Sequence, residues 1–448
     1  MPHLGRLSHL IGDRGRAVLH AGSWSLVAKL CAAANLFLSI PLALRALDAT
    51  QFGLWVTLVS LTAFAGFLDF GFSNGTMNLL AAAKGKDAKE EVAQILRQSL
   101  RVLLVLAAWL AVALGGAWLI VPWGKLVELP LETAGPAFAA LACVFVAIVL
   151  SLPLNLGHRV QLGLGRGDRA FKWQAVGQLG ALVSVAIVGK VQPSLLAMTA
   201  VAVFTPLLAS LANTTSLLRD PRLRPSSPSS REEGKAIRTA IRREGMLFFV
   251  LQLAAALAFS ADLALISTLY DPAAAGSYAV VQRIFSVAPL ALSMLWAPLW
   301  PIYRSALAKG DFPWVARTLN RSMILACLFA VTASTLIIAG FGPLMRALTD
   351  APTQTSALLL VGFGLWSVFE AVGNAVGTFL NSASVLRFQM FATISFAVSC
   401  VAAKVLLVAS GGIEWLPWAT IATYALTFVL PLALYWPKLL SAVRNRQY

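Results

Sequence analysis

Apolar runs of similar length follow one another along most of the chain, and the charged residues are concentrated between them. A helix needs roughly 20 apolar residues to cross the hydrocarbon core of a bilayer. By that criterion the pattern predicts about twelve transmembrane helices. They are expected at residues 23–44, 52–72, 102–121, 136–156, 171–191, 194–217, 246–269, 277–303, 323–341, 356–380, 388–410 and 415–435.

The composition supports the same prediction, because 58% of the residues are hydrophobic and only 12% are charged. A soluble protein is usually about one quarter charged, so this chain has too few charges for a water-facing surface. We therefore expect an all-α polytopic membrane protein. A loop rich in Pro, Ser and charge divides the helices six and six. This division predicts an N-terminal lobe (1–222), a cytoplasmic linker (223–245) and a C-terminal lobe (246–448).

Lys and Arg are unequally distributed over the two faces of this topology. With the N-terminus in the cytoplasm, 28 of the 35 fall in or beside cytoplasmic segments. Only Arg45, Lys125, Lys190 and Arg346 fall on the other face. Cytoplasmic loops of membrane proteins carry an excess of Lys and Arg. Both termini are therefore expected in the cytoplasm, and the net charge of +16 is attributed to topology rather than to nucleic-acid binding.

The cysteines and histidines form no ligand pattern. The four Cys lie inside apolar runs and the four His are scattered. We therefore expect no disulfide, no metal site and no cofactor. The sequence also lacks a Gly-Lys-Ser/Thr phosphate loop, which argues against ATP hydrolysis.

Two segments at the ends of the second predicted helix carry a family resemblance. The segment at its start reads LRALDATQFGLW (44–55), and the segment at its end reads LDFGFSNGTMNLLA (68–81). They resemble the opening of Wzx-type flippases, which are the polysaccharide transporters of the MOP exporter superfamily. The resemblance is sharpest over residues 27–83, and it departs from the family pattern at Leu47 and Asp48, where a Gly is more usual.

This resemblance implies two six-helix bundles in a MATE-like V around a cavity that opens alternately to each side. It also implies a flippase rather than an enzyme. Its cargo would be a polyprenyl-diphosphate-linked oligosaccharide, such as an O-antigen, exopolysaccharide or capsule repeat unit. That cargo would move from the inner to the outer leaflet of the bacterial cytoplasmic (inner) membrane. The expected partners are this lipid-linked oligosaccharide, membrane lipids, and polysaccharide polymerase and chain-length proteins.

Charges inside the predicted helices are candidates for substrate binding, because charges in a membrane are costly and usually functional. Lys29 and Asp69 lie toward the inner ends of the first two helices. Asp262 and Arg283 lie near the outer ends of the seventh and eighth. Lys29 and Arg283 would hold the diphosphate, and Asn74 would lie at the cavity entrance. The alternative is that each acid and base form a structural ion pair.

A carboxylate near the middle of the tenth predicted helix is a candidate for ion coupling. Glu370 has no cation at matching depth, and Asn374 lies one turn away on the same face. A carboxyl group in this position could bind H⁺ or Na⁺. The alternative is a hydrogen bond that joins helices. Lys404, near the outer end of its helix, is expected to extend toward the interface.

Other functions are weighed against the flippase. A MATE-like drug exporter would need an acidic pocket, whereas the charges within the helices are three acids and three bases. A lipid II flippase would have more helices. A membrane-embedded glycan polymerase or ligase would carry catalytic Arg or His in a long outer loop, and the outer loops here are short and lack His. A non-transporting assembly scaffold would have little use for buried charges at several depths.

Overall fold

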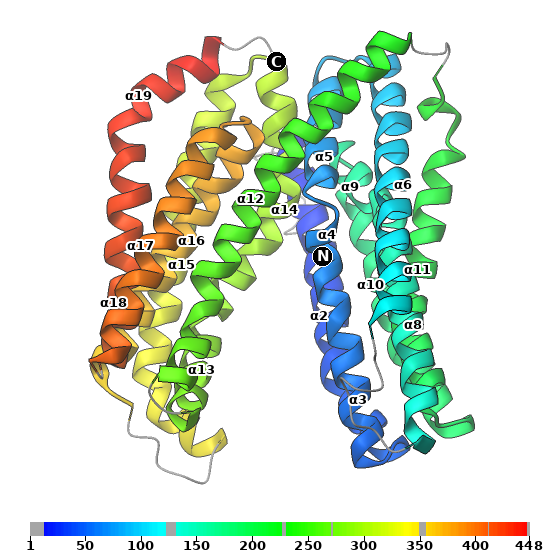
Figure 1. Cartoon of the computed structure of the whole chain (residues 1–448). Helices are drawn as coiled ribbons and strands as arrows, with labels where there is room; N and C mark the ends of the chain where they lie inside the picture. The colour runs from blue at the N-terminus through cyan, green and yellow to red at the C-terminus, as the bar shows by residue number, and fades with distance from the viewer. Residues whose placement is uncertain are drawn as a thin grey trace, which may run out of the picture. The chain divides into compact units, whose positions relative to one another are not determined.

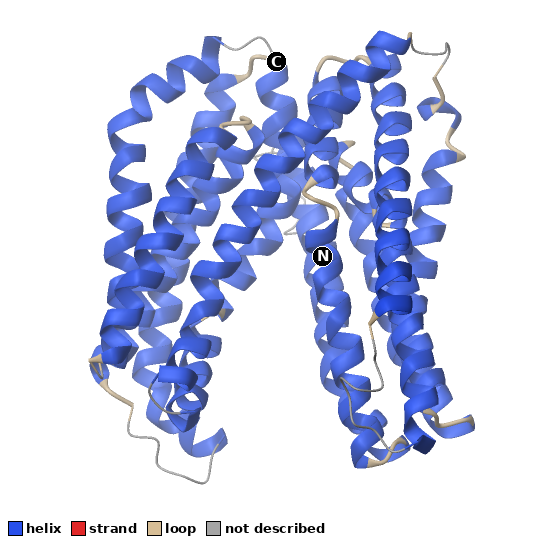
Figure 2. Cartoon of the chain, viewed as in Figure 1, coloured by secondary structure: helices blue, strands red, loops and turns tan. Residues whose placement is uncertain are grey.

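The computed structural model describes residues 13–121, 131–225, 230–269, 272–348, 355–410 and 412–445. Within these ranges every regular element is a helix, as Figure 2 shows, and the all-α class expected from the sequence is confirmed. The chain divides into two compact units, Met1–Met246 and Leu247–Tyr448. Helix α12 (Arg231–Leu269) runs through the boundary between them. Each unit is therefore described by itself.

The N-terminal unit is organised around α10 (Gly167–Val191), which packs along α2 (Asp13–Ala46) and α11 (Leu195–Leu218). Helix α11 packs in turn against α8 (Leu131–Leu154). In Figure 1 these helices run from blue to green. The other helices of this unit are α3 (Ala49–Ser60), α4 (Ala65–Leu68), α5 (Phe72–Gly85), α6 (Lys89–Ile120) and α9 (Leu156–Gly163), with 3-10 turns at Leu61–Phe64 and Pro221–Leu223.

Two buried apolar clusters stabilise this unit. The first joins α3, α8, α10 and α11 and includes Trp55, Val144 and Met198. The second joins α5, α6 and α9 to the start of α12 and includes Leu80 and Ile241. The first turns of α12 therefore belong to the N-terminal unit, although the sequence predicts a linker at residues 223–245.

Helices α5 and α12 touch backbone to backbone at two glycines. A Cβ added to Gly245 would lie 2.9 Å from the Phe72 Cα, and one added to Gly75 would lie 3.0 Å from the Ile241 carbonyl oxygen. Any side chain at Gly245 would therefore push the two helices apart.

The C-terminal unit is organised around α16 (Ala357–Ser382), which packs against α14 (Val287–Ala308), α15 (Phe312–Leu348) and α18 (Leu416–Tyr424). Helix α18 continues through a π-helical segment, Ala425–Val429, into α19. The remaining elements are α13 (Pro272–Phe285), α17 (Leu386–Ala409), the 3-10 turn Ile413–Trp415 and α19 (Leu430–Asn445).

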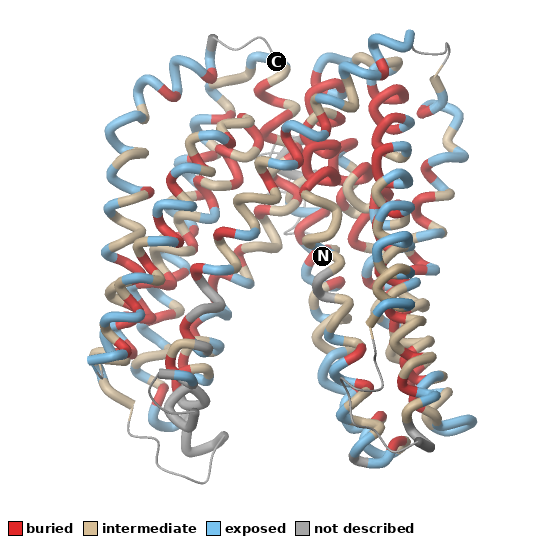
Figure 3. The backbone as a smooth tube through the Cα atoms, in the orientation of Figure 1, coloured by how far each residue is buried: buried red, intermediate tan, exposed pale blue. Residues whose placement is uncertain are grey.

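The described residues include 11 helical stretches long and apolar enough to cross a membrane. The predicted span at 246–269 forms the second part of α12. Large apolar side chains are exposed on the helices, including Leu119 at 86% and Ile120 at 83%. Figure 3 shows exposed positions alternating with buried ones along the helices. Such a surface suits lipid rather than water, and the chain is a polytopic membrane protein.

The second predicted helix is less regular than expected. The chain passes from α3 through a 3-10 turn into the short α4, which ends at Leu68. Phe70 and Gly71 then adopt left-handed backbone angles, with φ of 48° and 69°. The Gly71 N–H donates to Asp69 Oδ1 at 2.8 Å. Because glycine adopts this conformation without strain, the chain can turn here and begin α5.

After this turn the chain forms a buried helix and a second turn rather than one continuous helix. Residues 81–98 are divided between the end of α5 and the start of α6, and Asp87, with φ of 55°, lies in the turn between them. Helix α5 is buried along most of its length. The lysines around this turn mark a loop, while the residues before them pack against α6, α9 and the start of α12.

Candidate functional site

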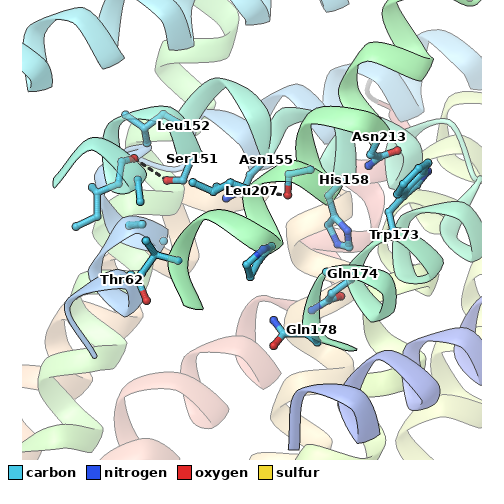
Figure 4. Close-up of a pocket in the computed structure, with 18 of the residues that line it drawn as sticks. Thr62, Ser151, Leu152, Asn155, His158, Trp173, Gln174, Gln178, Leu207 and Asn213 are labelled. Carbon is cyan, nitrogen blue, oxygen red and sulfur yellow. Dashed lines mark hydrogen bonds between the residues drawn. The ribbon is translucent and has the colours of Figure 1, made fainter. Parts of the chain in front are cut away.

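A polar cavity of about 570 Å³ lies within the N-terminal unit. Its walls come from α2, α3, α4, α5, α8, α9, α10 and α11, and Figure 4 shows part of its lining. The volume falls in the range of about 300–1,000 Å³ that is typical of small-molecule sites. The lining residues form two groups of different chemistry, which we call the charged end and the amide end.

The charged end consists of Asp69, His158 and Arg159. Asp69 comes from the turn before α5, and the other two come from α9. His158 Nδ1 lies 3.3 Å from the Ala170 carbonyl oxygen, and the imidazole meets the Phe171 ring edge to face, with centroids 5.5 Å apart. These two contacts attach α9 to the start of α10.

Arg159 is the cation of the cavity. It is half-buried and forms no salt bridge or hydrogen bond with the described residues. Asp69 attracts it electrostatically, but this carboxylate accepts its hydrogen bond from the Gly71 N–H. A guanidinium carries five N–H donors, so Arg159 offers unused donors and a positive charge to a ligand.

The amide end consists of Asn35 from α2 and of Gln174 and Gln178 from α10. Asn35 Nδ2 donates to Gln178 Oε1 at 2.9 Å, which joins the two helices. Gln174, one turn earlier on α10, is exposed and has no hydrogen-bond partner in the described ranges. Gln178 lies about 12 Å beyond Ala170 along α10, at a rise of about 1.5 Å per residue. Gln174 lies about 6 Å beyond Ala170 by the same rise, so Gln178 is the more distant of the two glutamines from the charged end.

Two further hydrogen bonds join α11 to α9 and to the residue before α9 in the cavity wall. Ser210 Oγ donates to Asn155 Oδ1 at 3.0 Å, and Gln161 Nε2 donates to Asn213 Oδ1 at 3.3 Å. Ser210 and Asn213 come from α11, while Asn155 immediately precedes α9. Figure 4 shows Asn155, His158 and Asn213 along this wall. Apart from Asp69, His158 and Arg159, the polar groups that line the cavity are therefore uncharged, and apolar residues of the same helices lie between them.

Of the residues proposed from the sequence, Asp69 lines the cavity, whereas Lys29 and Asn74 do not. Lys29 lies half-buried on α2. Asn74 is buried in α5, and its Oδ1 has no hydrogen-bond partner among the described residues. Its neighbour Ser73 reaches the cavity instead. Asp69 accepts a hydrogen bond from the Gly71 N–H, and the salt bridges described for the chain do not include the Lys29–Asp69 pair considered as the alternative.

In the C-terminal unit Asp262 pairs with Lys404 rather than with Arg283. Lys404 Nζ lies 2.5 Å from Asp262 Oδ1 and donates to the Ala258 carbonyl oxygen at 3.2 Å. The Tyr278 hydroxyl donates to Asp262 Oδ2 at 2.9 Å. The expectation that Lys404 extends to the interface was wrong, because its side chain is only 1% exposed. Arg283 is exposed on α13, and no described acid pairs with it.

Glu370 and Asn374 lie one turn apart on α16. Glu370 is half-buried, Asn374 is exposed, and neither side chain has an ion pair or hydrogen bond with the described residues. The hydrogen bond predicted as the alternative role of Glu370 is therefore not found in these ranges, and the carboxyl group is left able to bind a cation or a proton.

Sequence reasoning missed Arg159, Gln174 and Gln178. The predicted fourth helix ended at residue 156, so Arg159 was counted with the loop cations. The two glutamines were not considered. Their spacing within an apolar run, four residues apart on one helix face, was the signal that could have identified them.

The fold is that of a MOP-superfamily transporter. The chain matches a MOP-superfamily transporter from Pyrococcus furiosus over 98% of both chains, with 15% identity and a TM-score of 0.79. That protein is described as having a binding pocket of reverse polarity, which suggests a different function. An outward-facing MATE-family multidrug resistance transporter matches over 98% of both chains, with 14% identity and a TM-score of 0.73. A MATE transporter in complex with MaD5 matches 97% of this chain and 98% of its own, with 15% identity and a TM-score of 0.75.

These identities establish the fold alone, and the sequence supplies the family. Residues 18–303 match the family model of polysaccharide biosynthesis proteins. Since the match covers more than half of the chain, this protein belongs to that family, and the family resemblance found in the sequence is confirmed. No curated protein matches the chain.

Proposed function

We propose that this protein is a flippase that moves a polyprenyl-diphosphate-linked oligosaccharide from the inner to the outer leaflet by alternating access. The observation that supports this proposal most directly is a cavity whose polar lining includes carboxamides, hydroxyls and one Arg, in a member of the polysaccharide biosynthesis family. Carboxamides and hydroxyls can hydrogen-bond to sugar hydroxyls, and Arg binds phosphate in a bidentate manner. Asp69 is the one carboxylate among the described lining residues, which disfavours a site for cationic drugs.

In this proposal the residues selected from the sequence keep distinct roles. Lys29 on α2 and Arg283 on α13 attract the diphosphate as it crosses the membrane. Asp69 limits how tightly the cargo binds beside Arg159, and Asn74 supports the cavity through its neighbour Ser73.

Asp262 was also proposed as a substrate-binding residue. Its carboxylate already has Lys404 and Tyr278 as partners, so we assign it an indirect role, in which it fixes α12 against α17.

Ion coupling is proposed for Glu370 and Asn374. A carboxyl group without a described partner, next to an exposed carboxamide, can bind H⁺ or Na⁺. We expect Glu370→Gln to abolish the dependence of transport on an ion gradient while the protein still binds cargo. Unchanged transport driven by both H⁺ and Na⁺ gradients in proteoliposomes would exclude this role.

The proposal also includes the cellular setting. The protein would lie in the bacterial inner membrane with both termini in the cytoplasm, as the distribution of Lys and Arg indicates. It would act with polysaccharide polymerase and chain-length proteins, and would itself catalyse no covalent step.

The test is deletion of the gene, followed by assay of surface polysaccharide and of the lipid-linked repeat unit in each leaflet. The expected result is loss of surface glycan, with repeat units accumulated on the cytoplasmic leaflet. Complementation with Lys29→Ala or Arg283→Ala, at normal membrane abundance, should fail to restore transport. Normal glycan in the deletion strain together with sensitivity to cationic drugs would instead indicate an exporter.

A further inference from the structure

We propose that the cavity of the N-terminal unit recognises the first sugar of the cargo. The amide end binds hydroxyl groups of an uncharged sugar ring, and the charged end holds the anionic group that links this sugar to the lipid. This inference rests on the proposed function, and it adds where the sugar binds and which chemistry selects it.

The Asn35–Gln178 pair has the hydrogen-bonding capacity that a sugar requires. A carboxamide has one oxygen acceptor and two N–H donors. The contact of Asn35 Nδ2 with Gln178 Oε1, at 2.9 Å, leaves Asn35 Oδ1 and Gln178 Nε2 without partners in the described part of the chain. An acceptor and a donor are then held side by side. If both amides are flipped the pair remains complementary. Neighbouring hydroxyls of a sugar ring, one donating and one accepting, fit this arrangement.

A second pair repeats the arrangement on the adjacent wall. Ser210 Oγ donates to Asn155 Oδ1 at 3.0 Å, so Asn155 Nδ2 remains a donor and Ser210 Oγ remains an acceptor. Gln174 adds a carboxamide with no partner among the described residues. Unsatisfied polar groups inside a membrane bundle are costly. A ligand rich in hydroxyls, or the water it displaces, would satisfy them.

The distribution of charge indicates an uncharged ring. The charged lining residues, Asp69 and Arg159, belong to the charged end, and the described lining at the amide end carries neither acid nor base. A uronic acid there would bring a carboxylate with no cation to pair with, which is unfavourable in a low-dielectric site. Trp173, next to Gln174 on α10, adds an aromatic face to the lining.

The separation of the two ends sets the orientation of the cargo. By helix rise, Gln174 lies about 6 Å and Gln178 about 12 Å along α10 from Ala170, which His158 of the charged end contacts. Arg159 can therefore hold a phosphate group while the sugar attached to it reaches Gln174 and Gln178. The opposite orientation would place the phosphate among carboxamides and leave Arg159 without an anion.

The test measures binding of three lipids to the purified full-length protein in nanodiscs. The lipids are a polyprenyl diphosphate without sugar, the same lipid carrying one uncharged hexose, and the same lipid carrying one uronic acid. The variants are Asn35→Leu with Gln178→Met, Gln174→Met, and Arg159→Gln. Gln192→Met is the matched control, because Gln192 is an exposed amide at the end of the same helix, outside the cavity.

We expect the unmodified protein to bind the hexose lipid about tenfold or more tightly than the sugar-free lipid, from two or more added hydrogen bonds. The Asn35→Leu/Gln178→Met variant should lose most of this preference and keep its affinity for the sugar-free lipid. Arg159→Gln should lower the affinity for the hexose lipid and for the sugar-free lipid by a similar factor, so the ratio of the two affinities is preserved. Gln192→Met should change neither of these two affinities.

Three results would overturn the inference. The first is equal affinity of the unmodified protein for all three lipids. The second is that the Asn35→Leu/Gln178→Met variant loses affinity equally for the hexose lipid and the sugar-free lipid. The third is that the unmodified protein binds the uronic acid lipid more tightly than the hexose lipid. Gln174→Met, which removes no hydrogen bond described within the protein, serves if the double variant fails to fold. If none of the lipids binds or is flipped in proteoliposomes, the proposed function fails as well.

Discussion

The ion pair between Asp262 and Lys404 allows a quantitative prediction about the C-terminal unit. Both side chains are nearly inaccessible, at 6% and 1% exposure, and Nζ lies 2.5 Å from Oδ1. Lys404→Met retains a side chain of similar length and removes the charge. The carboxylate of Asp262 then stays buried with the Tyr278 hydroxyl as its described partner.

The expected cost follows from the buried environment. Removing one member of a buried ion pair typically costs about 3–5 kcal/mol, because the other charge loses its compensation. Replacing both members with apolar residues of similar volume is often neutral or stabilising by about 1–4 kcal/mol. For a unit of about 200 residues, 1 kcal/mol corresponds to roughly 2–4 °C in Tm. Lys404→Met should therefore lower the Tm by about 6–20 °C, and Asp262→Leu/Lys404→Met should recover most of that loss.

The assay can use a cysteine of the same helix. Cys400 is buried and lies one turn before Lys404 on α17. Labelling of its thiol by a fluorogenic maleimide during heating would report the unfolding of this region, with the other three cysteines replaced by Ala. Lys309→Met is the control, because Lys309 is exposed at the end of α14, and surface substitutions usually change stability by less than about 0.5 kcal/mol.

Two outcomes would refute this reasoning. One is a Tm for Lys404→Met within about 2 °C of the unmodified protein, which would show that the pair contributes little. The other is a double variant as unstable as the single one, which would show that Lys404 acts through packing rather than through charge compensation.

Two further predictions concern the N-terminal unit. Gly245→Ala should lower the Tm, because the added Cβ would lie 2.9 Å from the Phe72 Cα. Gly115→Ala is the control and should not lower the Tm, because Gly115 faces open space on α6. Equal Tm values for the two variants would exclude the close contact at Gly245. Asp220→Asn should also lower the Tm. The Arg222 N–H and, secondarily, the Arg166 side chain lower the pKa of Asp220 from 3.8. Its contribution is therefore present above pH 3.8 and lost only as the pH falls below that value. A Tm difference that disappears between pH 7 and pH 5 would contradict this assignment.

The membrane class and the helical fold were predictable because hydrophobic length is a property of each segment alone. Every predicted span lies largely within helices of the structure where residues are described, although 52–72 and 277–303 are each shared between successive helices. Hydrophobic length does not reveal the 3-10 turn at Leu61–Phe64 or the left-handed angles at Phe70 and Gly71 that end the segment 52–72. The buried position of α5 depends on contact with α12, whose first turns lie some 160 residues later in the sequence.

The partner of Asp262 shows a second limit of sequence reasoning. Rise per residue gives the depth of a side chain along its own helix. By that measure Asp262, Arg283 and Lys404 lie at comparable depths from the outer ends of their predicted helices. Depth alone cannot choose between two cations. The choice depends on helix rotation and on which helices are neighbours, and proximity in sequence favoured Arg283. In the structure the partner is Lys404, from α17.

The two units satisfy their buried charges in different ways, and this difference supports placing the proposed cargo site in the N-terminal unit. A charge in a membrane bundle needs an internal partner, water or a ligand. In the C-terminal unit Asp262 and Lys404 neutralise each other, and Glu370, an acid, could not attract a diphosphate. In the N-terminal unit Arg159 has no salt bridge within the described ranges and faces a cavity with carboxamides along its wall. An anionic lipid that carries a neutral sugar would supply both the charge and the hydrogen bonds missing there.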